Sequence, residues 1–547
     1  MRNFVLLIVV ILFSMVYSCK TGKMKIDTLY FNAQVYTVDS AFSKVESFAV
    51  DKGKIVATGT KENLLTNYEP SEQIDLTGKF VYPGFIDAHC HFYGYGLDLQ
   101  HADLKGSKSF DEVLERLQTH VQKYKTTWIM GRGWDQNLWR VKEFPTNEQL
   151  DKLFPDKPVL LIRVDGHAAI ANSEALKRAG ITLNTKIDGG SIVSKNGKLT
   201  GVLIDNAVEL VKNIIPKPNI EEEKQSLMLA QHNCFTVGLT SLSDAGLPVK
   251  TIHLIDSLQK AGQLSMRVYA MLDVSDSNFV AFMQKGIYKT DYLNVRSIKM
   301  YADGALGSRG ALLLQPYSDD VKNTGLSLTP IKQMIKNCKL AYKNNYQVCT
   351  HAIGDSANRM MLKIYGNILK TKNDLRWRIE HVQVVNENDF DLFAKFSVIP
   401  SVQPTHATSD MYWAEQRLGQ ERVKGAYAYK QLLQQNGWLA AGSDFPIENI
   451  NPVLGFYAAV ARKDFESKPE SGFQKENALT REQALRAMTI WAAKSSFEEL
   501  EKGSIEVGKF ADFVVTDKDL MTTPENDIFN IKVLKTFIGG KCVYNYE

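Results

Sequence analysis

The feature that most constrains the fold of this chain is a set of short apolar or β-prone segments that each end in a side chain able to bind a metal ion. The segment 82–91 ends in His89-Cys90-His91, and later segments end in His351, His381 and Asp444. Because side chains alternate across a strand, His89 and His91 point the same way and can share one ion. Ligands at the carboxyl ends of several strands are typical of the active site of a (β/α)8 barrel.

A lysine adds to this set. Lys299 lies inside the β-prone run 295–301, just before the Gly-rich segment 303–308. A lysine within a buried strand is costly unless another group compensates its charge. The chain therefore offers six candidate metal-site residues, namely His89, His91, Lys299, His351, His381 and Asp444. Cys90 points to the opposite face of its strand and is not counted as a ligand.

The order of these residues resembles the pattern of the amidohydrolase superfamily of metal-dependent hydrolases. In that pattern His-x-His ends strand 1, Lys lies on strand 4, His ends strands 5 and 6, and Asp ends strand 8. The motifs Pro-Gly-Phe-Ile-Asp-Ala-His at 83–89, Asp-Gly-Ala-Leu-Gly-Ser-Arg at 303–309 and Gly-Ser-Ile-Glu-Val-Gly-Lys-Phe-Ala-Asp at 503–512 narrow the resemblance. These motifs resemble those of amidohydrolase family 3, the branch that holds the YtcJ-like proteins and N-substituted formamide deformylases.

The resemblance and the spacing of the segments predict an α/β fold built on a TIM barrel. We expect barrel strands ending at His89 and running near 240–244, 267–272, 295–301, 347–351, 378–381, 399–403 and 439–444. From the second strand onward their spacing suits a βα repeat. The barrel is expected over 83–500. The resemblance implies that the β-rich segments 19–82 and 501–547 join into one small β-sandwich.

The gap between His89 and Thr240 is too long for one βα unit, so it must hold an insertion at about 95–220. Asn196-Gly197 lies between two β-prone runs of this insertion and predicts a hairpin. An insertion after strand 1 leaves the barrel on the face of the active site. We therefore expect it to roof the pocket.

Six ligand positions exceed what one tetrahedral zinc ion needs, so two divalent ions are favoured. A bridge between two ions needs an anionic bidentate group, which Lys299 becomes if CO2 carboxylates it to a carbamate, as in family members with this pattern. We expect His89, His91 and Asp444 on one ion, His351 and His381 on the other, and Lys299 across both. Asp444 would also act as the general base and acid.

Each of these assignments has a plainer alternative. Asp444 could cap a helix that begins at Pro446. Lys299 could form a salt bridge beside a site that holds a single ion. A lone histidine at a strand end is often a packed residue rather than a ligand.

Weaker signals mark residues that could contact substrate. These are Asp303 and Arg309 just after the fourth strand, Trp134 and His167 in the insertion, and Gln403 and His406 after the seventh strand. A guanidinium such as that of Arg309 could bind a carboxylate or carbonyl oxygen. Roles in loop structure or packing are the alternatives for all six.

The N-terminus resembles a bacterial lipoprotein signal over residues 1–18. Arg2 precedes an apolar run at 4–17 that is short for a membrane span, and Ser18 stands before Cys19. Cys19 would then be the lipidated residue of the mature chain, in the periplasm or at the outer membrane. Tyr17, and a valine at the usual leucine position, depart from the usual lipobox, so a plain signal peptide or a retained anchor helix is the alternative.

Composition excludes some classes of function. The net charge is +4 over 547 residues, and no basic run interleaves with aromatic residues, so nucleic-acid binding is not expected. The favoured function is hydrolysis of an amide or other non-peptide C–N bond in a small molecule by a membrane-anchored enzyme, and a homodimer is compatible with it. The alternatives are a hydrolase of the same fold acting on an ester, a lactone or a deamination substrate, and a non-catalytic binding protein of the envelope.

Overall fold

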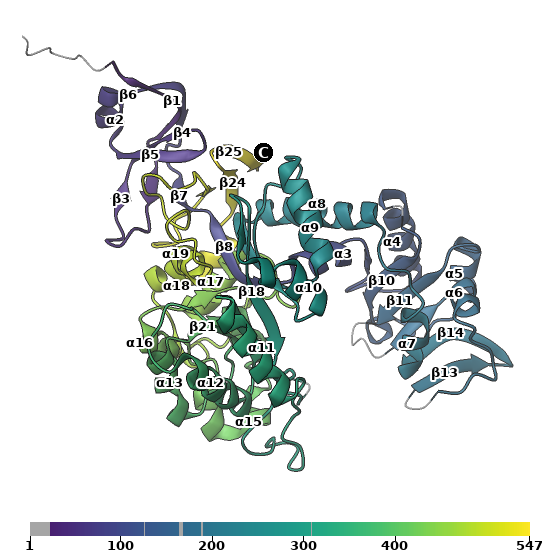
Figure 1. Cartoon of the computed structure of the whole chain (residues 1–547). Coiled ribbons are helices and arrows are strands. Elements are labelled where there is room, and N and C mark those ends of the chain that lie inside the picture. The colour runs from purple at the N-terminus through teal and green to yellow at the C-terminus, as the bar shows by residue number, and fades with distance from the viewer. Residues whose placement is uncertain (1–21, 125, 164–167, 188–189, 308, 547) are drawn as a thin grey trace, which may run out of the picture.

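The fold is centred on an eight-stranded parallel sheet that is nearly closed into a barrel (Figure 1). The structure is a computed structural model, and it describes residues 22–124, 126–163, 168–187, 190–307 and 309–546. The barrel strands are β8 (Phe85–Cys90), β15 (Leu239–Leu247), β16 (Arg267–Leu272), β18 (Leu293–Tyr301), β19 (Gln347–Ala352), β20 (Arg378–His381), β21 (Ile399–Val402) and β22 (Ala440–Ala441). They lie in the order β22-β21-β20-β19-β18-β16-β15-β8, which confirms the predicted TIM barrel.

The first and last barrel strands meet through a few specific contacts. The backbone N–H of Asp444 donates to the carbonyl of His89 at 2.8 Å, and the N–H of His91 donates to the carbonyl of Phe445 at 2.9 Å. Asp87 accepts from the Oγ of Ser443 at 2.6 Å. A Cβ atom at Gly442 would lie 2.5 Å from the backbone nitrogen of His89, so this close approach requires glycine.

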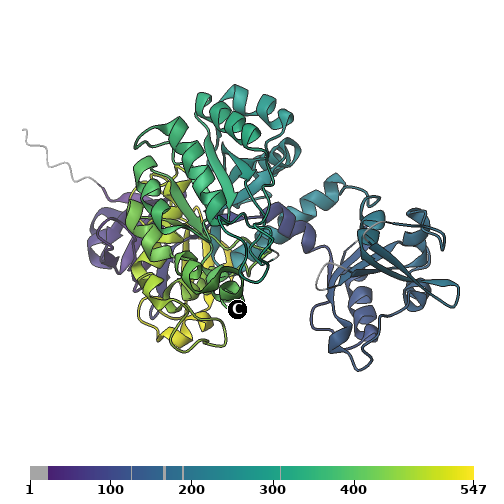
Figure 2. The same ribbon diagram turned by 90° about the horizontal axis from the view of Figure 1, so that it is seen from below.

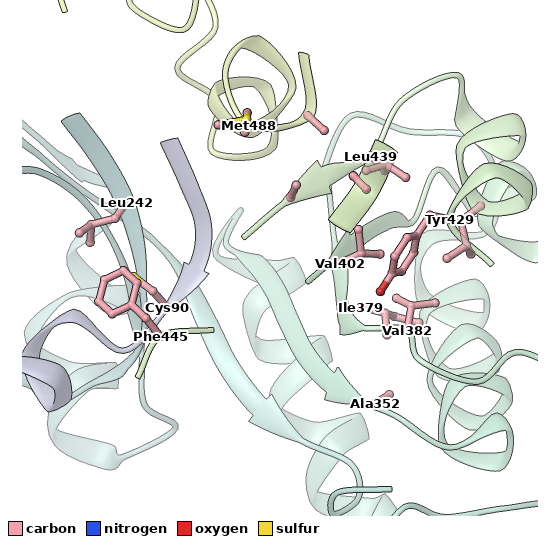
Figure 3. Close-up of a cluster of buried hydrophobic side chains, with 14 of the residues drawn as sticks. Cys90, Leu242, Ala352, Ile379, Val382, Val402, Tyr429, Leu439, Phe445 and Met488 are labelled. Atoms are coloured by element: carbon pink, nitrogen blue, oxygen red, sulfur yellow. The ribbon is translucent and has the colours of Figure 1, made fainter. Parts of the chain in front are cut away.

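Helices cover the outside of the barrel. They are α8 (Ile220–Thr236), α9 (Val249–Lys260), α10 (Asp276–Ala281), α11 (Ile331–Lys343), α12 (Asp355–Leu369), α13 (Phe390–Phe396), α14 (Pro404–Asp410), α15 (Ala414–Arg422), α16 (Tyr429–Asn436), α17 (Pro452–Ala461), α18 (Arg481–Ala487) and α19 (Ile490–Ser495). In α11 the buried Met334, Cys338 and Ala341 share one face because they lie three or four positions apart. Figure 3 shows part of the resulting core, with Cys90 beside Leu242 and Phe445.

The two ends of the chain share one β-sandwich. One sheet has the order β5-β4-β1-β6 and the other the order β25-β24-β23-β7-β2-β3. These elements are β1 (Met24–Phe31), β2 (Gln34–Tyr36), β3 (Lys44–Val45), β4 (Ser47–Asp51), β5 (Lys54–Gly59), α2 (Lys61–Asn67), β6 (Tyr68–Asp75), β7 (Phe80–Pro83), β23 (Phe513–Thr516), β24 (Val533–Ile538) and β25 (Lys541–Asn545). β23 pairs with β7 in antiparallel register, so an N-terminal and a C-terminal strand are direct neighbours.

An aromatic cluster fills the space between these sheets. Tyr30 stacks on Phe48 with ring centroids 4.9 Å apart, and Phe513 stacks on Phe537 at 4.3 Å. Nearby, Asp519 accepts hydrogen bonds from the hydroxyl groups of Tyr36 and Tyr82, both at 2.7 Å. Residues from both ends of the chain therefore contribute to one core.

The insertion after β8 forms a lobe with its own sheet, of order β13-β14-β12-β11-β10-β9. Its elements are β9 (Ala102–Asp103), α4 (Phe110–Lys123), β10 (Ile129–Trp134), α5 (Glu148–Leu153), β11 (Val159–Arg163), β12 (Ala168–Ala171), α6 (Ser173–Arg178), β13 (Gly190–Lys195), β14 (Lys198–Asp205) and α7 (Asn206–Lys212). β13 and β14 form the hairpin predicted at Asn196-Gly197.

The lobe stands to one side of the barrel in both views (Figures 1 and 2). The helices α3 (Phe92–Asp98) and α8 pack on each other at the junction and lead the chain outward and back. Because of this direction, the described part of the lobe flanks the mouth of the barrel and does not roof it, contrary to our expectation.

Within the described residues, no helix combines the length and the apolar character that crossing a membrane requires. The proposed signal segment 1–18 and Cys19 lie outside the described residues.

Candidate metal centre

The carboxyl ends of four barrel strands bring histidines and a carboxylate together. The ring of His381 lies 4.9 Å from that of His89 and 4.4 Å from that of His351, measured between centroids. Oδ1 of Asp444 lies 3.6 Å from Nε2 of His89 and 3.3 Å from Nε2 of His91. Side chains separated by more than 350 positions in the sequence thus converge at one point. The structure therefore brings five of the candidate ligands to this point, namely His89, His91, His351, His381 and Asp444.

Two residues whose side chains point into this centre, His381 and Asp444, have a strained backbone conformation. His381 has φ +75° and Asp444 has φ +63°, both in the left-handed region that residues with a Cβ seldom adopt. Each follows or ends a barrel strand, where a turn in the backbone redirects the side chain. Such strain persists only where the surrounding structure holds it, and it is commonly found at functional sites.

The donor atoms fall into two overlapping groups that could each hold a metal ion. One group is His89, His91 and Asp444, and the other is His381, His406 and Asp444. Within each group all donor atoms lie within 4.8 Å of one another. Asp444 belongs to both groups, since His406 Nε2 lies 3.5 Å from its second carboxylate oxygen. His406, which we expected to face substrate, is thus placed as a candidate ligand.

Lys299 lies at the edge of this centre on β18. Its Nζ is 3.0 Å from Nε2 of His89, and the side chain is buried. Burial lowers the pKa of Lys299, although Glu380 and Asp444 oppose the shift. As an ammonium group Lys299 offers no lone pair to a metal ion. The structure thus places Lys299 beside His89, and the chemical state of the lysine decides whether it is a ligand.

The histidines of the centre differ in their charge state. Burial acts to lower the pKa of His406, but hydrogen bonds to Asp444 and Glu448 outweigh burial and raise the pKa to about 10. Burial, followed by the charge of Lys299, lowers the pKa of His89 to about 4 and that of His351 to about 3. Burial and the neighbouring His351 also lower the pKa of His381 well below its usual range. Neutral imidazole is the form that binds metal ions. His351 Nε2 is buried with no hydrogen-bond partner among the described residues. The neutral histidines fit a divalent metal ion such as zinc.

Two residues that we did not predict fix the orientation of His89. Its Nδ1–H donates to a carboxylate oxygen of Glu380 at 2.7 Å, which leaves Nε2 free for a metal. Arg378 in turn lies with its Nε 3.0 Å from the other oxygen of Glu380, and all three side chains are fully buried. Burial acts to raise the pKa of Glu380, but the charges of Arg378 and His89 hold it at about 2.

The sequence carried a signal for this pair. Arg378 and Glu380 alternate with apolar residues in a strand that ends at His381. Charges inside a buried strand need compensation, which is the reasoning that drew attention to Lys299. Gln403 plays a comparable part for another ligand, because its Oε1 accepts from Nδ1 of His381 at 2.8 Å. We expected Gln403 to contact substrate, and this stays a prediction, because its Nε2 has no hydrogen-bond partner among the described residues.

The other candidates for substrate contact lie elsewhere. Asp303 is buried and accepts from the backbone N–H groups of Leu312, Ile353 and Gly354 at 2.8 to 3.0 Å, so it ties together the loops after β18 and β19. Arg309 is partly exposed and pairs with Asp319 at 2.9 Å. These two residues therefore stabilise loops.

Trp134 is a core residue of the lobe, which corrects our expectation that it lines the pocket. Its indole is buried, donates to the carbonyl of Leu161 at 2.8 Å and stacks on Trp139. The remaining candidate from the insertion, His167, lies outside the described residues. The sequence could not distinguish the two positions for Trp134, because a tryptophan at the end of a β-prone run can lie either in the lobe's core or at the pocket.

A parallel barrel whose strand ends converge on imidazoles and a carboxylate defines a metal-dependent hydrolase. The comparisons with known proteins agree. Residues 72–544 match the family model Amidohydro_3, described as the amidohydrolase family. The chain belongs to this family.

Several curated proteins are similar to the chain over nearly its whole length. Protein LONG AFTER FAR-RED 3 of Arabidopsis thaliana is 33% identical over 95% of this chain and 91% of its own length. The putative amidohydrolase YtcJ of Bacillus subtilis is 31% identical, over 93% of this chain and 98% of its own. N-substituted formamide deformylase of Arthrobacter pascens is 27% identical over 95% and 98%, respectively. These relatives confirm the branch that the motifs indicated.

Solved structures share the same architecture. An uncharacterized metal-dependent hydrolase from Pyrococcus horikoshii has a TM-score of 0.76 and 29% identity, with 91% of this chain and 99% of that chain covered. The zinc complex of atrazine chlorohydrolase TrzN from Arthrobacter aurescens has a TM-score of 0.52 and 14% identity, with 95% and 94% covered, and shows a shared fold alone.

Proposed function

We propose that this chain hydrolyses an amide or other non-peptide C–N bond of a small molecule. The observation that carries the proposal is the position of Asp444, a buried carboxylate that lies within 3.6 Å of three histidines, His89, His91 and His406. The relative from Arthrobacter pascens, whose name states deformylation of N-substituted formamides, supports a C–N bond as the target.

The residues divide into metal ligands and a proton carrier. We assign His89, His91 and Asp444 to one ion and His351 and His381 to a second, with zinc as the favoured metal. When bound, such ions supply Lewis acidity and lower the pKa of water. Asp444 accepts the proton of the attacking water and passes it to the leaving nitrogen. Burial acts to raise the pKa of Asp444, but hydrogen bonds from His406 and His91 hold it well below its usual range, so the carboxylate is ready to act as the base.

Lys299 is assigned as the bridge, in the form of a carbamate. The neutral amine is the form that attacks CO2, and burial favours that form here. The attack forms an N–C bond and releases one proton, which leaves an anionic group with two oxygens. The alternative is a centre with one ion and an unmodified lysine, and in that case His406, after losing its proton, would complete the set around His381 and Asp444.

The experiment pairs Asp444→Asn with a panel of small substrates. The full-length chain, loaded with zinc, is assayed against N-alkylformamides, other amides, esters, lactones and aminopurines. We expect hydrolysis of amides, and a loss of at least about a thousandfold in kcat for Asp444→Asn with metal still bound. Asp75→Asn, which changes an exposed carboxylate of the sandwich, is the control. Retained turnover in Asp444→Asn would remove the assigned base, and turnover of esters or aminopurines alone would replace the C–N amide assignment.

We also propose that the chain is a lipoprotein of the bacterial envelope, anchored through Cys19. The support is the signal-like segment 1–18 in the sequence. Labelling with a fatty-acid analogue in a bacterial host tests this, with Cys19→Ala as the control. Label that persists in Cys19→Ala would contradict the proposal.

A further inference from the structure

A cleft of about 760 Å³ lies at the junction between the barrel and the lobe, and His91 is among the residues that line it. At one end it is lined by His91, whose side chain is 32% exposed, and by Ile447, three residues after Asp444. The lobe contributes Met130 of β10, and Ile215 comes from the segment that leads to α8. The cleft therefore opens directly beside a proposed metal ligand, where α3 and α8 join the two parts in Figure 1.

Most of the charged groups that line this cleft already have partners, and the exposed Lys217 is the lining residue for which no ion pair is found among the described residues. His101 lies 3.6 Å from Asp98, Lys212 pairs with Glu209 at 2.9 Å, and Glu222 accepts from the backbone of Asn219 at 2.9 Å. A ligand therefore gains little by replacing these contacts, because each new ion pair would cost an existing one.

The apolar groups of the cleft, in contrast, are left facing solvent. Ile447 is 69% exposed, and its backbone N–H donates to the carbonyl of Asp444. Leu97 and Met130, which also line the cleft, are partly exposed. Pockets for small molecules commonly have such apolar walls beside a few polar groups that fix the orientation of the ligand.

We infer that this cleft is the subsite for an apolar substituent of the substrate, an inference that rests on the proposed function. With the amide at the metal centre, an alkyl or aryl group extends past His91 between Ile447 and Met130. The preferred substrates are then small amides with an apolar group of several carbons. This assignment also gives the lobe a role, since it supplies one wall of the subsite.

The test uses N-alkylformamides from methyl to octyl as probes of the full-length chain. Binding is measured by titration calorimetry, and kcat/KM is measured for the same series. Each methylene buried in the cleft should raise the affinity about two- to fourfold. In Ile447→Asp and Met130→Gln, which alter lining residues of the barrel and of the lobe, this gain per methylene should fall toward onefold. Val280→Asp adds a charge at another exposed apolar residue, in α10 and outside the lining of the cleft, and should keep the wild-type gain.

The outcomes separate the subsite from the proposed function. Hydrolysis with no dependence on chain length, or with the same dependence in Ile447→Asp and Met130→Gln, overturns the subsite and leaves the proposed function standing. Affinity that rises with chain length and falls in both variants supports the subsite even if no formamide is hydrolysed, and in that case the proposed function alone fails. Metal content, measured on every variant, shows whether any loss arises from a damaged metal centre.

Discussion

Replacing Glu380 with glutamine should weaken metal binding, although Glu380 is not itself a ligand. Glutamine has nearly the same shape but carries no charge, so it no longer matches the fully buried guanidinium of Arg378 3.0 Å away or the Nδ1–H of His89 2.7 Å away. Loss of such a supporting hydrogen bond typically reduces metal affinity about 10- to 100-fold. An unpaired buried charge costs about 3–5 kcal/mol of stability. Both effects are expected from one substitution.

Metal affinity is measured by competition with a chromophoric chelator, and stability by denaturant unfolding of the metal-free chain. Glu421→Gln removes a carboxylate from an exposed pair with Lys424 and should change the unfolding free energy by less than about 0.5 kcal/mol. Glu380→Asp keeps the charge but shortens the side chain, and should fall between wild type and Glu380→Gln in metal affinity. Unchanged metal affinity in Glu380→Gln would refute the view that Glu380 positions His89.

Three further predictions concern the sandwich, the lobe and the metal itself. Asp519→Asn should cost about 1–3 kcal/mol of stability, because Tyr36 and Tyr82 lose a charged acceptor. Burial acts to raise the pKa of Asp519, but hydrogen bonds from Met521, Tyr82 and Tyr36 lower it below the usual 3.8. The stability that Asp519 contributes is therefore present above that pH and is lost as the pH falls through the lowered pKa. Acid unfolding of the variant should depend less on pH than that of wild type, and an identical dependence would contradict a lowered pKa of Asp519. Trp134→Ala should destabilise the lobe by about 3–5 kcal/mol in denaturant unfolding and leave KM for short formamides unchanged. A large rise in KM without loss of stability would instead show that Trp134 lines the pocket. Dialysis against a chelator should lower the melting temperature, zinc should restore it, and mass spectrometry should find about two ions per chain for a bridged centre or about one if Lys299 is unmodified.

The barrel could be predicted because its signals are local. Four of the expected strands are short runs that end in a histidine or aspartate, and from the second strand onward the spacing between runs matches one βα unit. Even the last strand, reduced to Ala440–Ala441, was marked by the run that ends at Asp444. The order of ligands along the chain therefore predicted their meeting point, because parallel strands end at one rim of a barrel.

Partners within the site could not be predicted in the same way. Glu380 and His89 are 291 positions apart, and only the closed barrel brings them within 2.7 Å. Strand alternation gives the face of a side chain but not which side chain meets it. Asp303 shows the same limit, since its position suggested a pocket residue, yet three backbone N–H groups occupy its carboxylate.

The placement of the lobe depends on still longer-range geometry. Its direction is set by how α3 and α8 pack on each other, and nothing in either helix alone encodes that packing. The sequence correctly indicated a separate unit with its own hairpin. Its position relative to the pocket could not be predicted without knowing how the two helices of that junction pack. Trp134 was misplaced for a different reason, because its burial follows from the packing of the lobe's own core.

The contacts that close the barrel also set the time at which the protein can acquire its metal. His89 and Asp444 are held together by a backbone hydrogen bond of 2.8 Å between the first and last strands, so about 440 residues must be synthesised before the ligands can meet. A nascent chain that has made only the first four or five strands exposes isolated histidines with no carboxylate between them. The candidate centre can therefore form only after β22 and Asp444 have been made, and a chain truncated before β22 has the first candidate ligands but no centre.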